Sequence, residues 1–343
     1  MVNKTNLGSF TMLPKTADWH FLYAFVALNT LIRGWEYCMP AVAVDGTFLK
    51  SSYAGTILCA TVLDAVGKIL PLAYANVDYE NDASWDWFFR KLKQAYGERE
   101  NMYIVSDRHD SILKATSNVN LDVPHYNCIY HLWNNIKRRF KKHHERLRLI
   151  FFAMANAYMR ADFNRLMEDT DNIDDKVRGY LFDIGYEKWS IAHSAVSRSM
   201  VMTSNIAKSL NSATRHVRDP PIKNLLEFMM NLVMRWNNDN RKDAIATFTE
   251  LGNKYNIIMK ENIILSDKMT VMTSTDYVYS VMDAEKRNIV CMREKKCSCQ
   301  RFQIDWISCP HAMAVLSYTH MEVQNYCAAY YTKEYFLKTY EMM

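Results

Sequence analysis

Three cysteines and one histidine near the end of the chain have a spacing suited to metal binding. Cys297 and Cys299 form a Cys-x-Cys pair, and Cys309 and His311 form a Cys-x-His pair, all within fifteen positions. Zinc binds three thiolates and an imidazole tetrahedrally, with Zn–S distances near ~2.3 Å. The alternative is two unrelated thiol pairs beside a surface histidine. The close spacing favours one structural Zn2+ site whose binding folds the segment.

Two aspartates mark a second place for chemistry. Asp45 ends the apolar run Ala41-Val42-Ala43-Val44, and Asp107 ends the run from Met102 to Ser106. Runs of this kind are typical of strands buried on both faces, and an acid at the end of such a strand lies at the rim of the sheet. Two carboxylates there can hold a divalent cation. By itself, Asp45 before Gly46 is equally typical of a hairpin turn.

A third feature is a run of positive charge between positions 137 and 148. Such a run is either a solvated helix face or a contact surface for the phosphates of nucleic acid. The candidate DNA-binding residues are Lys137, Arg138, Arg139, Lys141 and Lys142.

The elements around these residues predict one fold class. Apolar patterning predicts a helix from Phe21 to Ile32 and another from Ser84 to Gly97, where Ser84 is the N-cap. Strands are expected near 41–47, 56–63, 69–77, 102–107 and 125–130, with a further helix over 111–119. Three hairpin-linked strands followed by two crossover units predict an α/β, ribonuclease-H-like mixed sheet. In that sheet the strands that carry Asp45 and Asp107 are neighbours.

The remainder of the chain is expected to be helical up to a β-like stretch near 269–281. A helix is expected to begin at Thr203 or Ser204, two more over 222–236 and 240–262, and a last one at Pro310. The predicted division is a helical lead-in over 1–35, a core over 36–240 with a helical insertion at about 145–200, a connector over 241–288, a small zinc-binding finger over 289–322 and a tail over 323–343.

Composition excludes several classes of protein. The chain has 343 residues, 49% of them hydrophobic, with a net charge of +5 and eight cysteines. That length and hydrophobic content can bury a sizeable core. No apolar run reaches the roughly 20 residues that a bilayer span needs, and the N-terminus lacks a secretory signal pattern. We therefore expect a soluble intracellular protein with no membrane partner.

Taken together, these motifs resemble a Mutator-like (MULE) transposase core followed by a SWIM zinc finger. This pair occurs in plant Mutator-type transposases and in far-red-response transcription factors derived from them. Besides the zinc motif, the resemblance is carried by Val44-Asp45-Gly46-Thr47-Phe48, Glu80-Asn81-Asp82-x-Ser84-Trp85-x-Trp87-Phe88, Ser106-Asp107-Arg108, Cys128-x-x-His131-x-x-Asn134 and Met202-Thr203-Ser204-Asn205.

The resemblance implies a DDE site, in which two aspartates and a glutamate hold two Mg2+ or Mn2+ ions for DNA strand cleavage and transfer. Asp45 and Asp107 match the aspartates, but Lys208 occupies the glutamate position within Asn205-Ile206-Ala207-Lys208-Ser209-Leu210-Asn211. This replacement removes a ligand and adds a cation, so impaired or absent catalysis is expected. Glu187 and Glu227 are alternative acids, although neither is at the matching position.

The resemblance further implies a nuclear, transposon-derived protein with affinity for DNA, and a homo-oligomer or nuclear protein partners are possible. Cys128 and His131 match the family's Cys-x-x-His element, for which a structural role or a DNA contact is expected. The family's N-terminal DNA-recognition domain has no counterpart in the first twenty residues, so low sequence specificity is expected. Two alternatives stay open: an active Mg2+- or Mn2+-dependent transposase, and a non-enzymatic regulator that binds protein or DNA.

Overall fold

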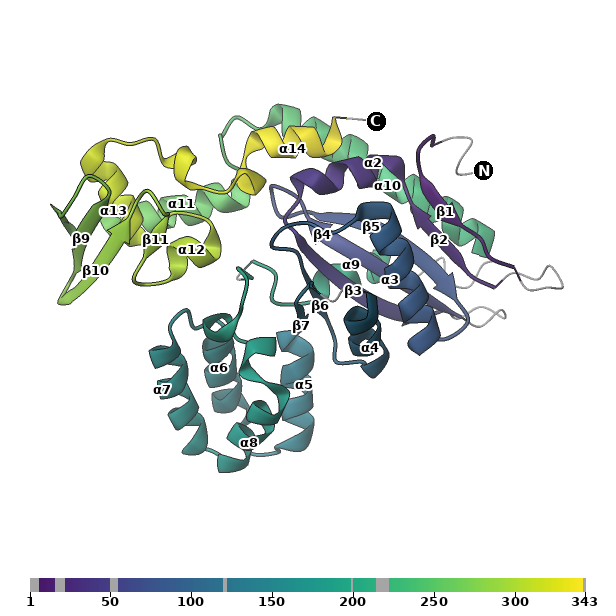
Figure 1. Ribbon diagram of the computed structural model, residues 1–343, viewed down its shortest axis with the longest axis horizontal. Helices are drawn as coiled ribbons and strands as arrows, with labels where there is room; N and C mark the ends of the chain where they lie inside the picture. Colours follow the sequence, from purple (N-terminus) through teal and green to yellow (C-terminus); the bar gives the residue numbers. More distant parts are fainter. Residues whose placement is uncertain are drawn as a thin grey trace. The chain divides into compact units, whose positions relative to one another are not determined.

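The computed structural model describes residues 6–15, 22–49, 55–119, 122–198, 200–213 and 222–341 (Figure 1). The chain divides into two compact units. The first unit comprises Met1–Cys128, Thr203–Phe248 and Lys333–Met343, and the second comprises Ile129–Met202 and Thr249–Thr332. In the described part of the chain, no helix is both long and apolar enough to cross a membrane.

A seven-stranded mixed sheet forms the centre of the first unit. Its strands are β1 (Phe10–Met12), β2 (Ala24–Ala27), β3 (Ala41–Phe48), β4 (Thr56–Leu63), β5 (Ile69–Val77), β6 (Tyr103–Ser106) and β7 (His125–Asn127), in the order β1-β2-β5-β4-β3-β6-β7. Strands β3, β4 and β5 are antiparallel to one another, whereas β6 is parallel to β3 and β7 is parallel to β6. This is the ribonuclease-H-like arrangement predicted from the sequence, with a β1–β2 hairpin added beside β5.

Helices cover both faces of this sheet. Helices α3 (Asp82–Tyr96) and α4 (Asp110–Val119) lie in front of the sheet in Figure 1, and α9 (Asn205–Ala213) and α10 (Ile222–Ala246) lie behind it. The unit also contains α2 (Asn29–Gly34), a 3-10 turn at Trp35–Tyr37 and α14 (Lys333–Tyr340). Strand β4 is buried along its whole length because helices pack on both of its faces.

Several predicted boundaries of the first unit were wrong. The structure has strand β2 where a helix was expected to begin at Phe21, which itself lies outside the described residues, and the helix begins only at Asn29. A short apolar run buried on both faces has no periodicity that distinguishes a strand from a helix. Helix α3 is capped by Asn81, with Ser84 at the third helical position of a capping box. The last strand of the sheet ends at Asn127, before the expected end at position 130.

The long helix α10 is also a correction, because two helices were expected over 222–236 and 240–262. The structure has one continuous helix to Ala246 and then α11 (Asn253–Ser266) in the second unit. The polar residues between 236 and 240 include no glycine or proline, so nothing in the sequence there stops the helix.

The second unit contains two clusters of elements. Helices α5 (Ile129–Arg139), α6 (His144–Ala155), α7 (Arg160–Asp171) and α8 (Asp175–Ile184) are followed by 3-10 turns at Tyr186–Lys188 and Ile191–His193. They enclose an aromatic core in which Phe151 stacks on Trp133 and on Trp189, with ring centroids 6.0 and 5.4 Å apart. Helices α6 to α8 fall in the region of the expected helical insertion, about 145–200, whereas α5 precedes it.

The other cluster contains a small antiparallel sheet in the order β11-β10-β9-β8. Its strands are β8 (Thr270–Thr273), β9 (Val278–Asp283), β10 (Lys286–Cys291) and β11 (Lys296–Cys297). Helices α11, α12 (Arg301–Asp305) and α13 (Pro310–Thr319) accompany this sheet, and 3-10 turns follow at Val323–Tyr326 and Ala329–Tyr331. Apolar residues of β9, β10 and α13 share one small buried core. A core of this size supplies little stability, so a bound metal would add to the stability of the cluster.

Candidate metal centre and acidic sheet edge

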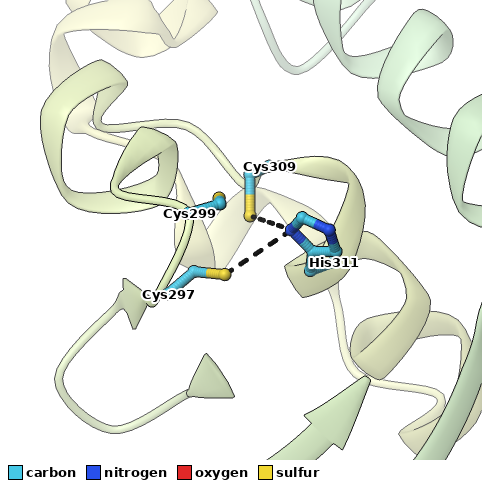
Figure 2. A group of neighbouring side chains, drawn as sticks. All are labelled: Cys297, Cys299, Cys309 and His311. Atoms are coloured by element: carbon cyan, nitrogen blue, oxygen red, sulfur yellow. Dashed lines mark hydrogen bonds between the residues drawn. The ribbon is translucent and has the colours of Figure 1, made fainter. Parts of the chain in front are cut away.

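The structure brings the four predicted zinc ligands together (Figure 2). Cys297 ends β11, Cys299 lies in the turn that follows it, and Cys309 is the N-cap of α13. Pro310 opens that helix, as predicted, and places His311 in its first turn. A short hairpin strand that ends at Cys297 and a helix that begins at Pro310 therefore present all four side chains to one point.

The ligand atoms of this group converge closely. The three sulfurs and one histidine nitrogen all lie within 4.8 Å of one another. The Nδ1 atom of His311 is 3.6 Å from the Sγ atom of Cys297 and 4.0 Å from that of Cys309. Cys297, Cys309 and His311 are buried, and Cys299 is half-buried. Figure 2 shows all four side chains directed toward the same space.

Hydrogen bonds to the backbone hold the two ligand pairs in place. The Cys297 N–H donates to the Gln303 side-chain oxygen over 3.0 Å, and the Gln303 amide donates to the Cys297 carbonyl over 3.1 Å. On the other side, the Asn262 amide donates to the carbonyl of Ser308, the residue before Cys309, over 2.9 Å. Side chains of α12 and α11 thus support both halves of the ligand set.

The crowding of the thiols perturbs their protonation. Hydrogen bonds from Cys297 and Cys309 lower the pKa of the Cys299 thiol, and those from Cys297 and Cys299 raise the pKa of Cys309 above its ordinary value. Burial acts to lower the pKa of His311, but hydrogen bonds and negative charge from Cys297 and Cys299 raise it to about 10. The Cys299 thiol therefore loses its proton readily, whereas the Cys309 thiol does not, because a second thiolate would be repelled by the first. A divalent cation removes that conflict, so this donor set fits Zn2+.

Asp45 lies within β3 and Asp107 directly follows β6, and these two strands are neighbours, as predicted. The parallel register pairs Ala43 of β3 with Val105 of β6, and each aspartate follows its paired residue by two positions. Both side chains are half-buried. The Oδ1 atom of Asp107 accepts the backbone N–H of His109 over 3.1 Å. Each aspartate therefore lies two residues beyond the last pair of the parallel β3–β6 ladder, although β3 does not end at Asp45 but continues to Phe48, paired with β4.

Helix α9 places Lys208 on the same part of the sheet. Cys59 of β4 pairs with Asp45 in the antiparallel register, and its thiol contacts the Asp45 carbonyl at 3.4 Å and the Ala207 carbonyl at 3.9 Å. Lys208 is the next residue along α9, and its side chain is exposed. The helix that carries the third position of the predicted site thus packs beside the first aspartate, with a lysine at that position.

Glu80 was not predicted as a site residue from the sequence, although it belongs to one of the motifs that carry the family resemblance. Glu80 lies against Gly46, because a Cβ atom on that glycine would be only 2.9 Å from the Glu80 Oε1 atom. The Trp85 indole donates to the same oxygen over 3.2 Å. Burial raises the pKa of Glu80, and the charge of Asp107 adds to this, while His109 and the Trp85 hydrogen bond oppose it. The sequence feature that could have indicated this contact is Gly46, directly after Asp45, because a glycine lets another side chain come close to the backbone.

The carboxylates at the sheet edge do not converge as the zinc ligands do. Among the described residues, the cysteine–histidine group alone brings three or more potential ligand atoms within 4.8 Å of one another. The two acids considered as substitutes belong to other elements. Glu187 is in a 3-10 turn of the second unit, and Glu227 of α10 pairs with Lys223 at 3.7 Å.

The Cys-x-x-His element joins the end of the large sheet to α5. The Cys128 N–H donates to the Ser106 carbonyl over 2.7 Å, and its thiol is buried. His131 is half-buried in the first turns of α5. Within the described parts of the chain, neither residue belongs to a metal-binding group.

The basic run spans the end of α5 and the turn before α6. All five candidate DNA-binding residues have exposed side chains: Lys137, Arg138, Arg139, Lys141 and Lys142. The Arg139 guanidinium lies over the Tyr180 ring at 4.9 Å. A depression beside Lys141 and Lys142 is also lined by Asp171, Asp174 and Asp175 of the insertion. These acids reduce the positive potential at that end of the run.

Comparison with known proteins finds two domain families in parts of the chain. A family model for the MULE transposase domain matches residues 41–135, and a model for the SWIM zinc finger matches residues 292–320. The chain therefore carries a MULE transposase domain and a SWIM zinc finger. The first match contains Asp45, Glu80 and Asp107, and the second contains all four predicted zinc ligands.

Two more distant similarities add nothing on function. A stretch of 127 residues, 33% of this chain, is 28% identical to the PKS-NRPS hybrid synthetase cheA of Chaetomium globosum, and it covers 3% of that protein. Among solved structures, the HTLV-2 integrase catalytic core domain in complex with magnesium aligns over 37% of this chain and 81% of its own, with 12% identity and a TM-score of 0.20.

Proposed function

We propose that this chain is a transposon-derived nuclear protein whose SWIM finger binds one structural Zn2+ and whose MULE core binds DNA with impaired or absent catalysis. The matched MULE and SWIM domains support the general assignment. The exposed lysines and arginines at the end of α5 support a contact with DNA phosphates. Low sequence specificity is expected of contacts that reach only the backbone of DNA.

The observation that carries the loss of catalysis is the position of Lys208. Helix α9 contacts β3 and β4, and Ala207 lies over the Cys59 thiol opposite Asp45. A glutamate in place of Lys208 would add a further carboxylate beside Asp45 and Asp107. A lysine brings an ammonium to that edge instead, which repels a divalent cation and supplies no ligand.

Nicking of supercoiled plasmid in Mn2+ tests this proposal. We compare the wild type with Asp45→Asn, with Lys208→Glu, with Lys208→Gln and with the double variant Lys208→Glu/Asp45→Asn. Nicking is expected from Lys208→Glu alone, because only that variant restores the acid while keeping Asp45. The glutamine variant separates removal of the positive charge from restoration of a ligand. Wild-type nicking that disappears in Asp45→Asn would contradict the proposal.

Glu80 favours a second candidate function, an active Mg2+- or Mn2+-dependent transposase. Its carboxylate lies against Gly46, the residue after Asp45, which supports a place for it beside the aspartates. On this alternative, the wild type nicks DNA and Glu80→Gln abolishes the activity. Glu227→Gln, which removes the exposed acid paired with Lys223, serves as the matched control.

A further inference from the structure

The orientation of the His311 ring identifies which nitrogen faces the metal. Its Nδ1 atom lies 3.6 and 4.0 Å from the sulfurs of Cys297 and Cys309. If Nδ1 binds the metal, the single proton of the neutral imidazole must lie on Nε2. The His311 side chain is buried, so this N–H needs an acceptor within the protein.

One carboxylate is in position to be that acceptor. The Oδ2 atom of Asp283 lies 3.4 Å from the Nε2 atom of His311. The Nε2 atom is itself buried, and it has no hydrogen bond to any described residue. A closing movement of a few tenths of an ångström would bring the pair to ordinary hydrogen-bond length.

The hairpin before the ligand segment fixes the position of Asp283. Asp283 is the last residue of β9 and pairs with Lys286, the first residue of β10. The two residues between them, Ala284 and Glu285, make the turn, and Ala284 has a positive φ of 50°. The other end of β10 pairs with β11, which carries Cys297. A single small sheet therefore links Asp283 to the first zinc ligand.

We propose that Asp283 is a positioning residue of the metal centre. Its carboxylate accepts the Nε2–H of His311, which holds the proton on Nε2 and turns Nδ1 toward the three sulfurs. Carboxylates play this part behind metal-bound histidines in many proteins. The inference rests on the zinc binding proposed above. It also extends the functional site to the β9–β10 hairpin, which precedes the segment matched as the SWIM finger.

The test measures zinc affinity of the full chain by competition with a chromogenic chelator. Asp283→Ala should lower the affinity by about tenfold or more, the range for loss of such a partner. Asp283→Asn keeps the shape and an acceptor oxygen but loses the charge, so an intermediate decrease is expected. Glu285→Gln removes a carboxylate from the same turn without reaching His311 and should leave the affinity unchanged.

A second measurement separates positioning from a general effect on folding. In the zinc-loaded wild type, 15N NMR should show His311 bound through Nδ1 and protonated at Nε2. In Asp283→Asn, the Nε2–H signal should shift and exchange faster with water, with little change in the signals of the distant helices. Wild-type affinity in both Asp283 variants, or a ring bound through Nε2, would overturn the inference. A wild type that binds no zinc would instead refute the proposed function.

Discussion

The SWIM finger and the acidic sheet edge are both places where several side chains could surround a metal. They differ in how far apart in the sequence those side chains lie. The four zinc ligands come from fifteen consecutive positions and converge within 4.8 Å. The sheet edge draws Asp45, Asp107 and Lys208 from β3, from the end of β6 and from α9. A site built from distant elements can lose one ligand while the fold persists. A site built from one short motif cannot, because its metal and its fold depend on each other.

Removal of the metal should therefore have the largest effect, and it should be confined to the finger. One zinc per chain is expected in the purified protein, and Cys297→Ser or His311→Ala should lose it. Structural Zn2+ supplies about 10–16 kcal/mol to small zinc domains, so the finger should unfold without it. Elemental mass spectrometry gives the stoichiometry, and amide exchange shows where protection is lost. A metal-free wild type with a protected finger would contradict this prediction.

A buried acid in the first unit should make stability depend on pH, in contrast to the exposed acids of the same unit. Burial raises the pKa of Asp64 from 3.8 to about 6, although hydrogen bonds from the Lys68 N–H and the Tyr340 hydroxyl oppose the shift. The folded state then holds this proton more tightly than the unfolded state does. Its contribution to stability is present below pH 4 and is lost as the pH rises through 6, by roughly 3 kcal/mol.

Urea unfolding at a series of pH values checks this dependence. Asp64→Asn should flatten the profile between pH 4 and 6.5, because the titrating group is gone. Asp243→Asn is the control, since Asp243 is exposed and pairs with Lys68 at the surface. An unchanged slope in Asp64→Asn would show that another group titrates.

A smaller effect should identify Glu80 as part of the sheet edge. Gly46→Ala places a Cβ atom 2.9 Å from the Glu80 Oε1 atom, so this carboxylate must move away from its hydrogen bond with Trp85. We expect a loss of about 1 kcal/mol in the free energy of unfolding. Addition of Glu80→Ala should remove most of that loss, which a double-mutant cycle measures as coupling.

Gly179→Ala provides the matched control for this cycle. Gly179 lies within α8, and a Cβ atom there would have no neighbour within 4 Å. Alanine in a helix is favoured over glycine by roughly 0.5–1 kcal/mol, so this variant should be slightly more stable than the wild type. Equal destabilisation by both substitutions would mean that contact with Glu80 is not the cause.

The ribonuclease-H-like sheet could be predicted from the sequence because strand-like runs and a capped helix follow one another in the order that this fold requires. The convergence of the cysteines and His311 could be predicted because ligand type and spacing are both local. The β1–β2 hairpin was missed because Phe10–Met12 is very short and Ala24–Ala27 has no periodicity. Glu80 and Asp283 were missed because each meets its partner, Gly46 or His311, only through tertiary packing of elements that are far apart in the sequence.

The smallest expected effect concerns DNA. Lys141→Ala and Lys142→Ala should each weaken binding to a random duplex and reduce the slope of log affinity against log salt by about one. Lys91→Ala, on α3 beside Gln94, should leave that slope unchanged. Identical slopes in all variants would mean that Lys141 and Lys142 do not contact DNA. The aspartates beside these two lysines, which lower the local positive potential, would then explain the lack of contact.

The difference between the SWIM finger and the acidic sheet edge is tested most directly by measuring Zn2+ and Mn2+ binding in the same protein sample. The zinc-loaded wild type and Lys208→Glu are titrated with Mn2+, and free Mn2+ is followed by electron paramagnetic resonance. We expect one tightly held zinc in both proteins, and Mn2+ binding that Lys208→Glu gains and Lys208→Glu/Asp45→Asn loses again. Tight binding of Mn2+ by the wild type, abolished in Asp45→Asn, would show that the sheet edge is an intact metal site and would contradict the account.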